Sequence, residues 1–396
     1  MKNGQSTMYN SRTLLKAIFA HPEDDALRLI YSDWLDEHGD SARADFIRLQ
    51  LRLARLPIYD PRLSELIDQE RAMLRSNEQN WFSELPSLSG VTWGAFERGF
   101  VESAEFDDVH SFLRQAEAVI DLIPLREARF LDLTPITLAH LASSRQLSRI
   151  KALDLSHHGL TDKEIGTLLR SPNVTGLEVL DLDYNEIGDE GLQILSESRF
   201  LNELRELKLS RNNYHGFGIQ LLAESQNVEN IVTLDVSKNM IGRLGTMALT
   251  KANGLNSLRE LSLAATNLDS SGVESLLSSP YFSDLINVDI SANPDIGDDG
   301  AISLAMSTRV KQIQILHLGV SNITDIGAEA IATSPYFTAL RWLDLSGNRI
   351  GKRGAIALSR SPFLSELTQL DLRHNPFLDR SGACVLQRRF SGRLRL

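Results

Sequence analysis

The fold is decided by a segment that reads Leu177-Glu178-Val179-Leu180-Asp181-Leu182-Asp183-Tyr184-Asn185-Glu186-Ile187-Gly188. Its frame, Leu-x-x-Leu-x-Leu-x-x-Asn-x-Ile, recurs through the second half of the chain with Leu, Ile or Val at the apolar places. The polar place is filled in turn by His158, Asn185, Asn212, Asn239, Thr266, Asn293, Ser321, Asn348 and Asn375. Successive copies are 27 residues apart, except for one spacing of 28 between Asn293 and Ser321. A fixed period of this length indicates a stack of similar structural units.

Each unit is expected to contain one strand and one helix. The Leu-x-Leu alternation predicts a short strand with one buried face. The Asn amide both donates and accepts, so we expect it, and likewise His, Thr or Ser, to satisfy the backbone of stacked turns. The acidic stretch 188–191 followed by Leu192 and Leu195 predicts a helix with carboxylates at its positive end. Helices are expected to stop at the turns Ser279-Pro280-Tyr281-Phe282, Ser334-Pro335-Tyr336-Phe337 and Ser361-Pro362-Phe363-Leu364.

A unit of 27 residues cannot bury its apolar face alone, whereas stacked units can, which predicts an α/β solenoid. Residues 125–378 resemble leucine-rich repeat proteins of the ribonuclease-inhibitor-like subclass. The resemblance implies a horseshoe of about ten parallel inner strands with outer helices. We expect the solenoid to span 98–378, including an N-terminal cap made of a strand at 98–106, a helix at 109–122 and an irregular copy at 130–133.

The region before the repeats shows helical patterns over residues 11–85. Pro22, followed by three acidic residues, is typical of a helix start. The stretch 21–40, together with 45–50, resembles the bacterial repeat-companion domain over about residues 11–56, with Asp33 and Trp34 among the matching positions. Asp33 and Trp34 are explained first as a helix-face carboxylate and a core aromatic. We therefore expect a small all-α domain at 1–97.

Composition excludes several classes of protein. The 396 residues carry a net charge of -11, which argues against a broadly basic nucleic-acid-binding surface. The single cysteine, Cys384, cannot form an intrachain disulfide and is expected to be buried. The first ten residues lack the apolar run of a signal peptide, and no stretch approaches the roughly 20 apolar residues that cross a membrane. We expect a cytoplasmic protein without a membrane partner.

No constellation of residues predicts catalysis, a cofactor or a metal. Asp181-x-Asp183-x-Asn185 imitates a calcium loop, but Glu186 and Leu192 stand where that loop needs Gly and Glu. His157-His158 lacks the spaced Cys or His of a zinc site. The sequence therefore predicts a protein that is not an enzyme and has no cofactor.

One column of residues is expected to face the inner side of the repeats, between the two strand leucines. In successive copies it is Asp132, Asp154, Asp181, Lys208, Asp235, Ser262, Asp289, His317, Asp344 and Asp371. Carboxylates at adjacent strand positions repel. The repeat consensus alone explains them, and the functional alternative is an acidic surface that attracts a basic partner.

A candidate binding patch lies in the eighth and ninth repeats. Ile315 and Trp342 occupy equivalent outward places, with Val320 nearby, and an exposed Trp beside apolar residues is typical of a binding hot spot. The alternative is that Trp342 only covers the next strand. The residues expected to bind a partner are Ile315, His317, Trp342 and Asp344, supported by the charges of Asp289 and Asp371.

These features predict a non-catalytic scaffold that binds a protein or peptide, basic if the acidic column takes part, on the inner face of the repeats. The alternative function is regulation of another enzyme, as ribonuclease inhibitors and GTPase activators of this fold do. The last segment, 379–396, has five Arg and one Asp and is expected to form a C-terminal cap with a basic tail. The sequence does not determine the oligomeric state.

Overall fold

The structure is a computed structural model that describes residues 11–57, 60, 62–199, 202–252, 254–279, 281–390, 392 and 394–396. Pro280 of one predicted turn, and the first ten residues, lie outside this set. The chain divides into two units, Met1–Asp154 and Leu155–Leu396. The predicted limits after residues 97 and 378 remain predictions.

The first unit begins with the predicted helices. They are α1 (Ser11–Ala20), α2 (Asp25–Glu37), α3 (Ser41–Ala54) and α4 (Leu63–Ser83). The Asp24 side chain accepts the N–H of Ala26 at 2.9 Å and so caps α2. One apolar cluster holds α1, α2 and α3 together and includes Ile18, Leu35 and Ile47, all buried. The expectation of an all-helical N-terminal region is confirmed.

Strands follow in the same unit. They are β1 (Val91–Trp93), β2 (Phe96–Glu97), β3 (Phe100–Val101), β4 (Ser103–Asp108), β5 (Glu127–Asp132) and β6 (Ala152–Asp154), with α5 (Val109–Leu122), α6 (Pro135–Ser143) and η1 (Arg145–Arg149) between them. β1 is antiparallel to β4, whereas β4, β5 and β6 are parallel. The expected continuous strand at 98–106 is wrong, because Arg98 and Gly99 turn the chain at φ +47° and +92°. A Cβ on Gly99 would lie 2.4 Å from Ile47, so this turn also requires Gly for space.

The irregular first copy has a different register from the one expected. Arg129, and not Asp132, lies opposite Asp154 on the neighbouring strand. Asp132 lies opposite Asp108 instead. β5 is six residues long, and its first three residues pair with β6. The sequence Phe130-Leu131-Asp132-Leu133 resembles the repeat frame but begins three residues after the start of that paired segment. The predicted column therefore begins with Arg129, which contacts Asp154 at 3.3 Å.

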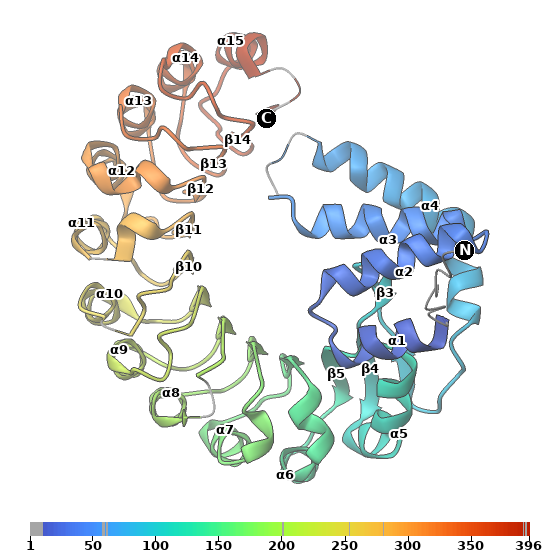
Figure 1. Cartoon of the computed structure of the whole chain (residues 1–396). Helices are drawn as coiled ribbons and strands as arrows, with labels where there is room; N and C mark the ends of the chain where they lie inside the picture. The colour runs from blue at the N-terminus through green and yellow to red at the C-terminus, as the bar shows by residue number, and fades with distance from the viewer. Residues whose placement is uncertain are drawn as a thin grey trace, which may run out of the picture. The chain divides into compact units, whose positions relative to one another are not determined.

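The second unit alternates strands and helices (Figure 1). Its strands, in sheet order, are β7 (Val179–Asp181), β8 (Glu206–Lys208), β9 (Thr233–Asp235), β10 (Glu260–Ser262), β11 (Asn287–Asp289), β12 (Ile315–His317), β13 (Trp342–Asp344), β14 (Gln369–Asp371) and β15 (Leu394–Arg395). Its helices are α7 (Asp162–Leu169), α8 (Asp189–Glu197), α9 (Gly216–Glu224), α10 (Gly242–Thr250), α11 (Ser270–Ser278), α12 (Gly297–Met306), α13 (Asp325–Thr333), α14 (Lys352–Arg360) and α15 (Arg380–Phe390), with shorter turns η2 (Pro172–Val174), η4 (Tyr281–Asp284) and η5 (Thr308–Gln312). The strands form one layer and the helices the other, as predicted.

The strand leucines form a continuous buried row. Leu180 lies opposite Leu207, and Leu207 opposite Leu234, in a parallel register that continues from strand to strand. These three side chains are buried. The predicted solenoid core is therefore confirmed.

A ladder of Asn side chains links successive turns. Asn293 Oδ1 accepts the N–H groups of Thr266 and Leu268, at 2.9 and 3.0 Å, in the preceding repeat. Its Nδ2 donates to the carbonyls of Leu263 and Ile290, at 2.8 and 3.0 Å. The same pattern of acceptance and donation is made by Asn185 and Asn348. The predicted role of the Asn amide is confirmed.

Two turns depart from this pattern. Each belongs to a repeat that is followed by a repeat with Thr or Ser in place of Asn. Where Thr266 and Ser321 replace Asn, their main-chain oxygens accept the N–H groups of Gly242 and Gly297, both at 3.1 Å. These two glycines have φ of +52° and +55°, a conformation that favours Gly. The expectation that the Thr and Ser side chains replace the Asn amide as acceptors is wrong. At these two positions the main-chain oxygen accepts the hydrogen bond instead. The residue type at the polar position of one repeat is thus correlated with the turn conformation of the preceding repeat.

Candidate functional site

The predicted inner column is confirmed as a row of in-register residues within the second unit. It runs Asp181, Lys208, Asp235, Ser262, Asp289, His317, Asp344 and Asp371. The Lys208 ammonium lies 3.3 Å from Asp181 and 3.2 Å from Glu206. Partial burial disfavours the Lys208 charge, but Glu206 and Asp181 more than offset it and raise its pKa. The column is therefore partly neutralised by its own cations.

His317 and Asp344 form an ion pair across β12 and β13. Nδ1 of His317 lies 3.5 Å from Oδ2 of Asp344. Burial disfavours the His317 charge, yet the Asp344 contact and the charge of Asp289 outweigh it and raise the His317 pKa. The pKa of Asp344 is lowered, because its hydrogen bonds to His317 and Ser346 outweigh burial.

The pKa of His317 predicts a measurable titration. The charge on His317 stabilises the pair below the unfolded value of 6.5, and this contribution disappears as pH rises through the higher folded value. Asp344 contributes above 3.8 and loses its contribution as pH falls through its lowered value. Because protonated His quenches a neighbouring indole, we expect the fluorescence difference between the wild type and His317→Gln to show a step with a midpoint above 6.5 as pH is raised. The difference is used because His38 also stacks on a tryptophan, Trp34, at 3.9 Å. A step below that pH would contradict the assignment.

Trp342 is the central aromatic residue of this surface. Its ring meets the edge of the His317 ring at a centroid distance of 5.3 Å, and the Arg395 guanidinium lies 5.9 Å from its centroid. Trp342 is half-buried, so part of the indole remains accessible. The expected exposure of Ile315 is wrong, since it is only 4% exposed. Its in-register neighbour is Trp342, whose ring is large enough to cover it.

The two supporting carboxylates differ in accessibility. Asp371 is 4% exposed, and both its oxygens bind Arg373, with Nη2 at 2.6 Å from Oδ2. Asp371 therefore does not offer the accessible negative charge that was expected. Asp289 is half-buried, and its Oδ1 accepts the N–H of Ser291 at 2.9 Å. We name the set His317, Trp342, Asp344 and Arg395 the Trp342 surface; Ile315 is buried and is left out of it.

Val320 borders the Trp342 surface in an unfavourable backbone conformation. It is 55% exposed and has a φ of +54°, which a β-branched residue rarely adopts. A Cβ on Gly347, in the next turn, would lie 2.7 Å from Cγ2 of Val320. An exposed apolar side chain is thus held over the turn that follows Trp342. The same position also has a positive φ in the neighbouring repeats, at Ala292 and Gly347, so this conformation belongs to the repeat and it is the exposed side chain that is particular to Val320.

A second cluster on the second unit was not predicted from the sequence. The rings of His157 and Tyr184 stack at 4.1 Å, Arg211 lies 5.1 Å from the Tyr184 centroid, and Lys238 Nζ lies 3.4 Å from the Tyr184 hydroxyl. All four occupy the residue before the polar position and have positive φ. The 27-residue period placed them in a row, but their left-handed turn conformation, which brings the side chains together, has no signal in the residue types.

Asp183 lies in the turn of this cluster. Burial and the charge of Asp181 raise its pKa to about 7, although the N–H of Ser210 donates to it at 2.6 Å. Since the folded pKa exceeds the unfolded one, the ionised carboxylate opposes folding, a penalty that is fully present above pH 7 and disappears toward about pH 4.

Asp183→Asn is therefore expected to stabilise the second unit by about 1 kcal/mol at pH 8, after allowance for solvent screening, and to change little at pH 5. Urea unfolding at both pH values measures this difference. Asp344→Asn is the control of opposite sign, because the pKa of Asp344 is lowered. Equal effects of Asp183→Asn at pH 5 and pH 8 would show that its carboxyl titrates normally.

The C-terminal segment completes the second unit. β15 pairs in parallel with β14, which brings Arg395 beside Asp371 and within reach of Trp342. Cys384 lies on α15 and is exposed, so its expected burial is wrong; the buried positions of this helix are Gly382, Leu386 and Phe390. Among the described residues, no three His, Cys, Asp or Glu side chains are grouped to hold a metal ion. Within the same set, no helix has the length and apolar character needed to span a bilayer.

Comparison with known proteins agrees with this architecture. A family model described as Leucine Rich repeat matches residues 175–196, 285–305 and 338–359. A chain in the crystal structure of the yeast Rad7 and Elc1 complex aligns with a TM-score of 0.56 and 15% identity, over 93% of this chain and 95% of that one. An internalin, InlF from Listeria monocytogenes, aligns with a TM-score of 0.35 and 19% identity, over 69% of this chain and 91% of that one. No curated protein matches the sequence. The chain therefore contains leucine-rich repeats that fold as a solenoid of parallel strands and outer helices.

Proposed function

We propose that the protein is a non-catalytic scaffold that binds a protein or peptide on the strand layer of its repeats, at the Trp342 surface. The observation that carries the proposal is the half-buried indole held between His317 and Arg395. Trp and Arg are enriched among residues that dominate binding energy. Because the strands hold these side chains in place before binding, little conformational entropy is lost when a partner docks.

Three further observations support this choice. The exposed Val320 supplies apolar surface beside Trp342. The side chains of Asp289, His317 and Asp344 supply charged groups around it. The yeast Rad7 and Elc1 structure is that of a protein complex, which favours a protein partner for a similar fold. An acidic or mixed-charge surface of this kind fits a partner that carries some basic residues.

The finer assignments belong to the same proposal. We place the repeats in the ribonuclease-inhibitor-like subclass and the N-terminal helices in the repeat-companion type, with domains at 1–97, 98–378 and 379–396. A cytoplasmic location is proposed with them. An enzyme regulated by this chain would be one kind of partner, so the variants described below also test that alternative.

Trp342→Ala is expected to weaken partner binding about thirtyfold or more, the effect of losing a hot-spot residue of about 2 kcal/mol. The partner is first captured on the immobilised full chain, and its affinity for the variants is then measured by calorimetry. Thr233→Ala, at the equivalent place on β9, is the matched control and should bind as the wild type does. An unchanged affinity in Trp342→Ala, with an unchanged melting curve, would refute the proposed site.

A further inference from the structure

The α-helices of the second unit change charge from acidic to basic toward its C-terminal end, although the short turn η5 between α12 and α13 carries Arg309 and Lys311. α12 and α13 contain four Asp or Glu residues and no Lys or Arg. The next two helices, α14 and α15, contain no Asp or Glu and six basic residues, which are Lys352, Arg353, Arg360, Arg380, Arg388 and Arg389. Five of these are exposed, whereas Arg389 is half-buried and donates to the carbonyl of Ser359 at 2.8 Å. In a chain with a net charge of -11, this concentration of cations is local.

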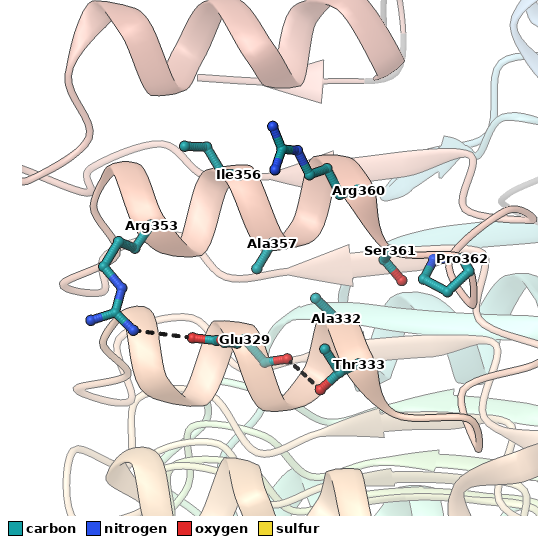
Figure 2. Close-up of a pocket in the computed structure, with 9 residues that line it drawn as sticks. All are labelled: Glu329, Ala332, Thr333, Arg353, Ile356, Ala357, Arg360, Ser361 and Pro362. Carbon is teal, nitrogen blue, oxygen red and sulfur yellow. Dashed lines mark hydrogen bonds and ion pairs between the residues drawn. The ribbon is translucent and has the colours of Figure 1, made fainter.

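A groove lies where the charge changes, between α13 and α14 (Figure 2). Its volume is about 360 Å³. Apolar atoms of Ala332, Ile356 and Ala357 contribute to its lining, and Ile356 and Ala357 are half-buried. Arg353 and Arg360 also line it, two turns apart on α14. The groove therefore combines an apolar surface with the guanidinium of Arg353, and the Arg360 guanidinium extends along the other side of α14, as Figure 2 shows.

Glu329 makes the two sides of the groove differ in charge. It lies on α13, and its carboxylate contacts Nη2 of Arg353 at 3.3 Å. Both side chains of this pair are largely exposed, so the pair is weak and a second carboxylate can compete for Arg353. Arg360, on the next part of α14, is exposed and shares the groove. An anionic ligand is thus attracted to the α14 side and repelled from the α13 side.

We propose that this groove binds an acidic segment of a partner protein, which places an apolar side chain between α13 and α14 and its carboxylates on Arg353 and Arg360. Arg binds carboxylates with paired hydrogen bonds, which gives orientation as well as attraction. A peptide fits better than a nucleic acid, because the continuous phosphates of a strand would also meet Glu329 and could not use the apolar lining. The groove lies on the helix layer, so it is separate from the Trp342 surface and the inference stands apart from the function proposed above.

The inference is tested by selecting a random twelve-residue peptide library on the immobilised full chain. We expect the enriched peptides to combine several Asp or Glu with an apolar residue. In fluorescence anisotropy, a labelled enriched peptide should bind the Arg353→Glu, Arg360→Glu double variant at least tenfold more weakly. Arg170→Glu is the matched control, because Arg170-Ser171-Pro172 repeats the local sequence of Arg360-Ser361-Pro362 on another repeat.

Further variants separate the possible outcomes. Arg360→Gln alone should weaken peptide binding less than the double variant does. Ile356→Ser, which adds no charge, should weaken peptide binding by removing the apolar contact. Trp342→Ala should leave peptide binding unchanged, which distinguishes this site from the strand-layer site. The proposal is overturned if the enriched peptides lack carboxylates or bind the double variant normally. It is also overturned if a twelve-nucleotide single-stranded DNA binds more tightly and loses affinity in the same variant.

Discussion

Glu102→Gln is expected to destabilise the first unit by about 3–5 kcal/mol, the cost of leaving a buried charge without its partner. Arg28 is fully buried and Glu102 is 4% exposed, and their charged atoms lie 2.8 Å apart. Glu102 also binds Arg98 at 2.6 Å. Burial lowers the pKa of Arg28 to about 10, although Glu102 opposes this effect. Removing the Glu102 charge would leave two guanidinium groups facing each other in a buried site.

The measurement is urea unfolding followed by tryptophan fluorescence. A Trp342→Phe background leaves Trp34, Trp81 and Trp93, so that the signal reports the first unit alone. Asp33→Asn is the control, because Asp33 pairs with Arg48 at 2.7 Å but is 73% exposed. We expect the control to cost less than about 1 kcal/mol, as exposed pairs do. A loss below that figure in Glu102→Gln would show that the buried pair contributes no more than an exposed one.

Asn293→Asp is expected to destabilise the second unit by about 4 kcal/mol, because several buried groups lose their partners at once. The Nδ2 of Asn293 donates to the carbonyls of Leu263, Ile290 and Ser291 at 2.8, 3.0 and 3.1 Å. A carboxylate of the same shape would place a negative oxygen against these three oxygens. The side chain is fully buried, so water cannot relieve the repulsion.

Far-UV circular dichroism during urea unfolding measures this loss. Asn322→Asp makes the same chemical change at an exposed turn position and is expected to have little effect. Lowering the pH should partly restore Asn293→Asp, because a protonated carboxyl can donate one hydrogen bond. Equal stability of the two variants at neutral pH would mean that the Asn ladder is not essential to the stack.

The regular part of the fold could be predicted because one physical pattern is repeated. The period fixes which leucines meet, so the register of Leu180, Leu207 and Leu234 follows from the spacing. The buried Asn amide was predictable for the same reason, since stacked turns leave the same backbone groups open at each repeat. The first copy lacks this repeated frame, so Asp132 was predicted at the place that Arg129 occupies.

The candidate site could be predicted only in part, because its neighbours come from distant parts of the sequence. The pairing of His317 with Asp344 follows from adjacent strands. The approach of Arg395 to Trp342 does not, because it depends on the C-terminal segment returning as β15. The pairing of Asp371 with Arg373 was not predicted, because Arg373 lies beyond the end of β14, outside the strand positions that the period aligns. The burial of side chains in the last repeats therefore depends on residues outside the repeat frame, such as Arg373 and Arg395.

The altered turns at Gly242 and Gly297 limit how the repeats can be rearranged. A repeat whose turn ends in such a glycine is followed by a repeat without the Asn amide. The main-chain oxygen of Thr266 or Ser321 then accepts the N–H of that glycine. If the order of two repeats were exchanged, an amide-bearing successor would meet a turn shaped for another acceptor. Recombination or engineering of this chain should therefore move neighbouring repeats as pairs, since a single transplanted repeat carries only half of its junction.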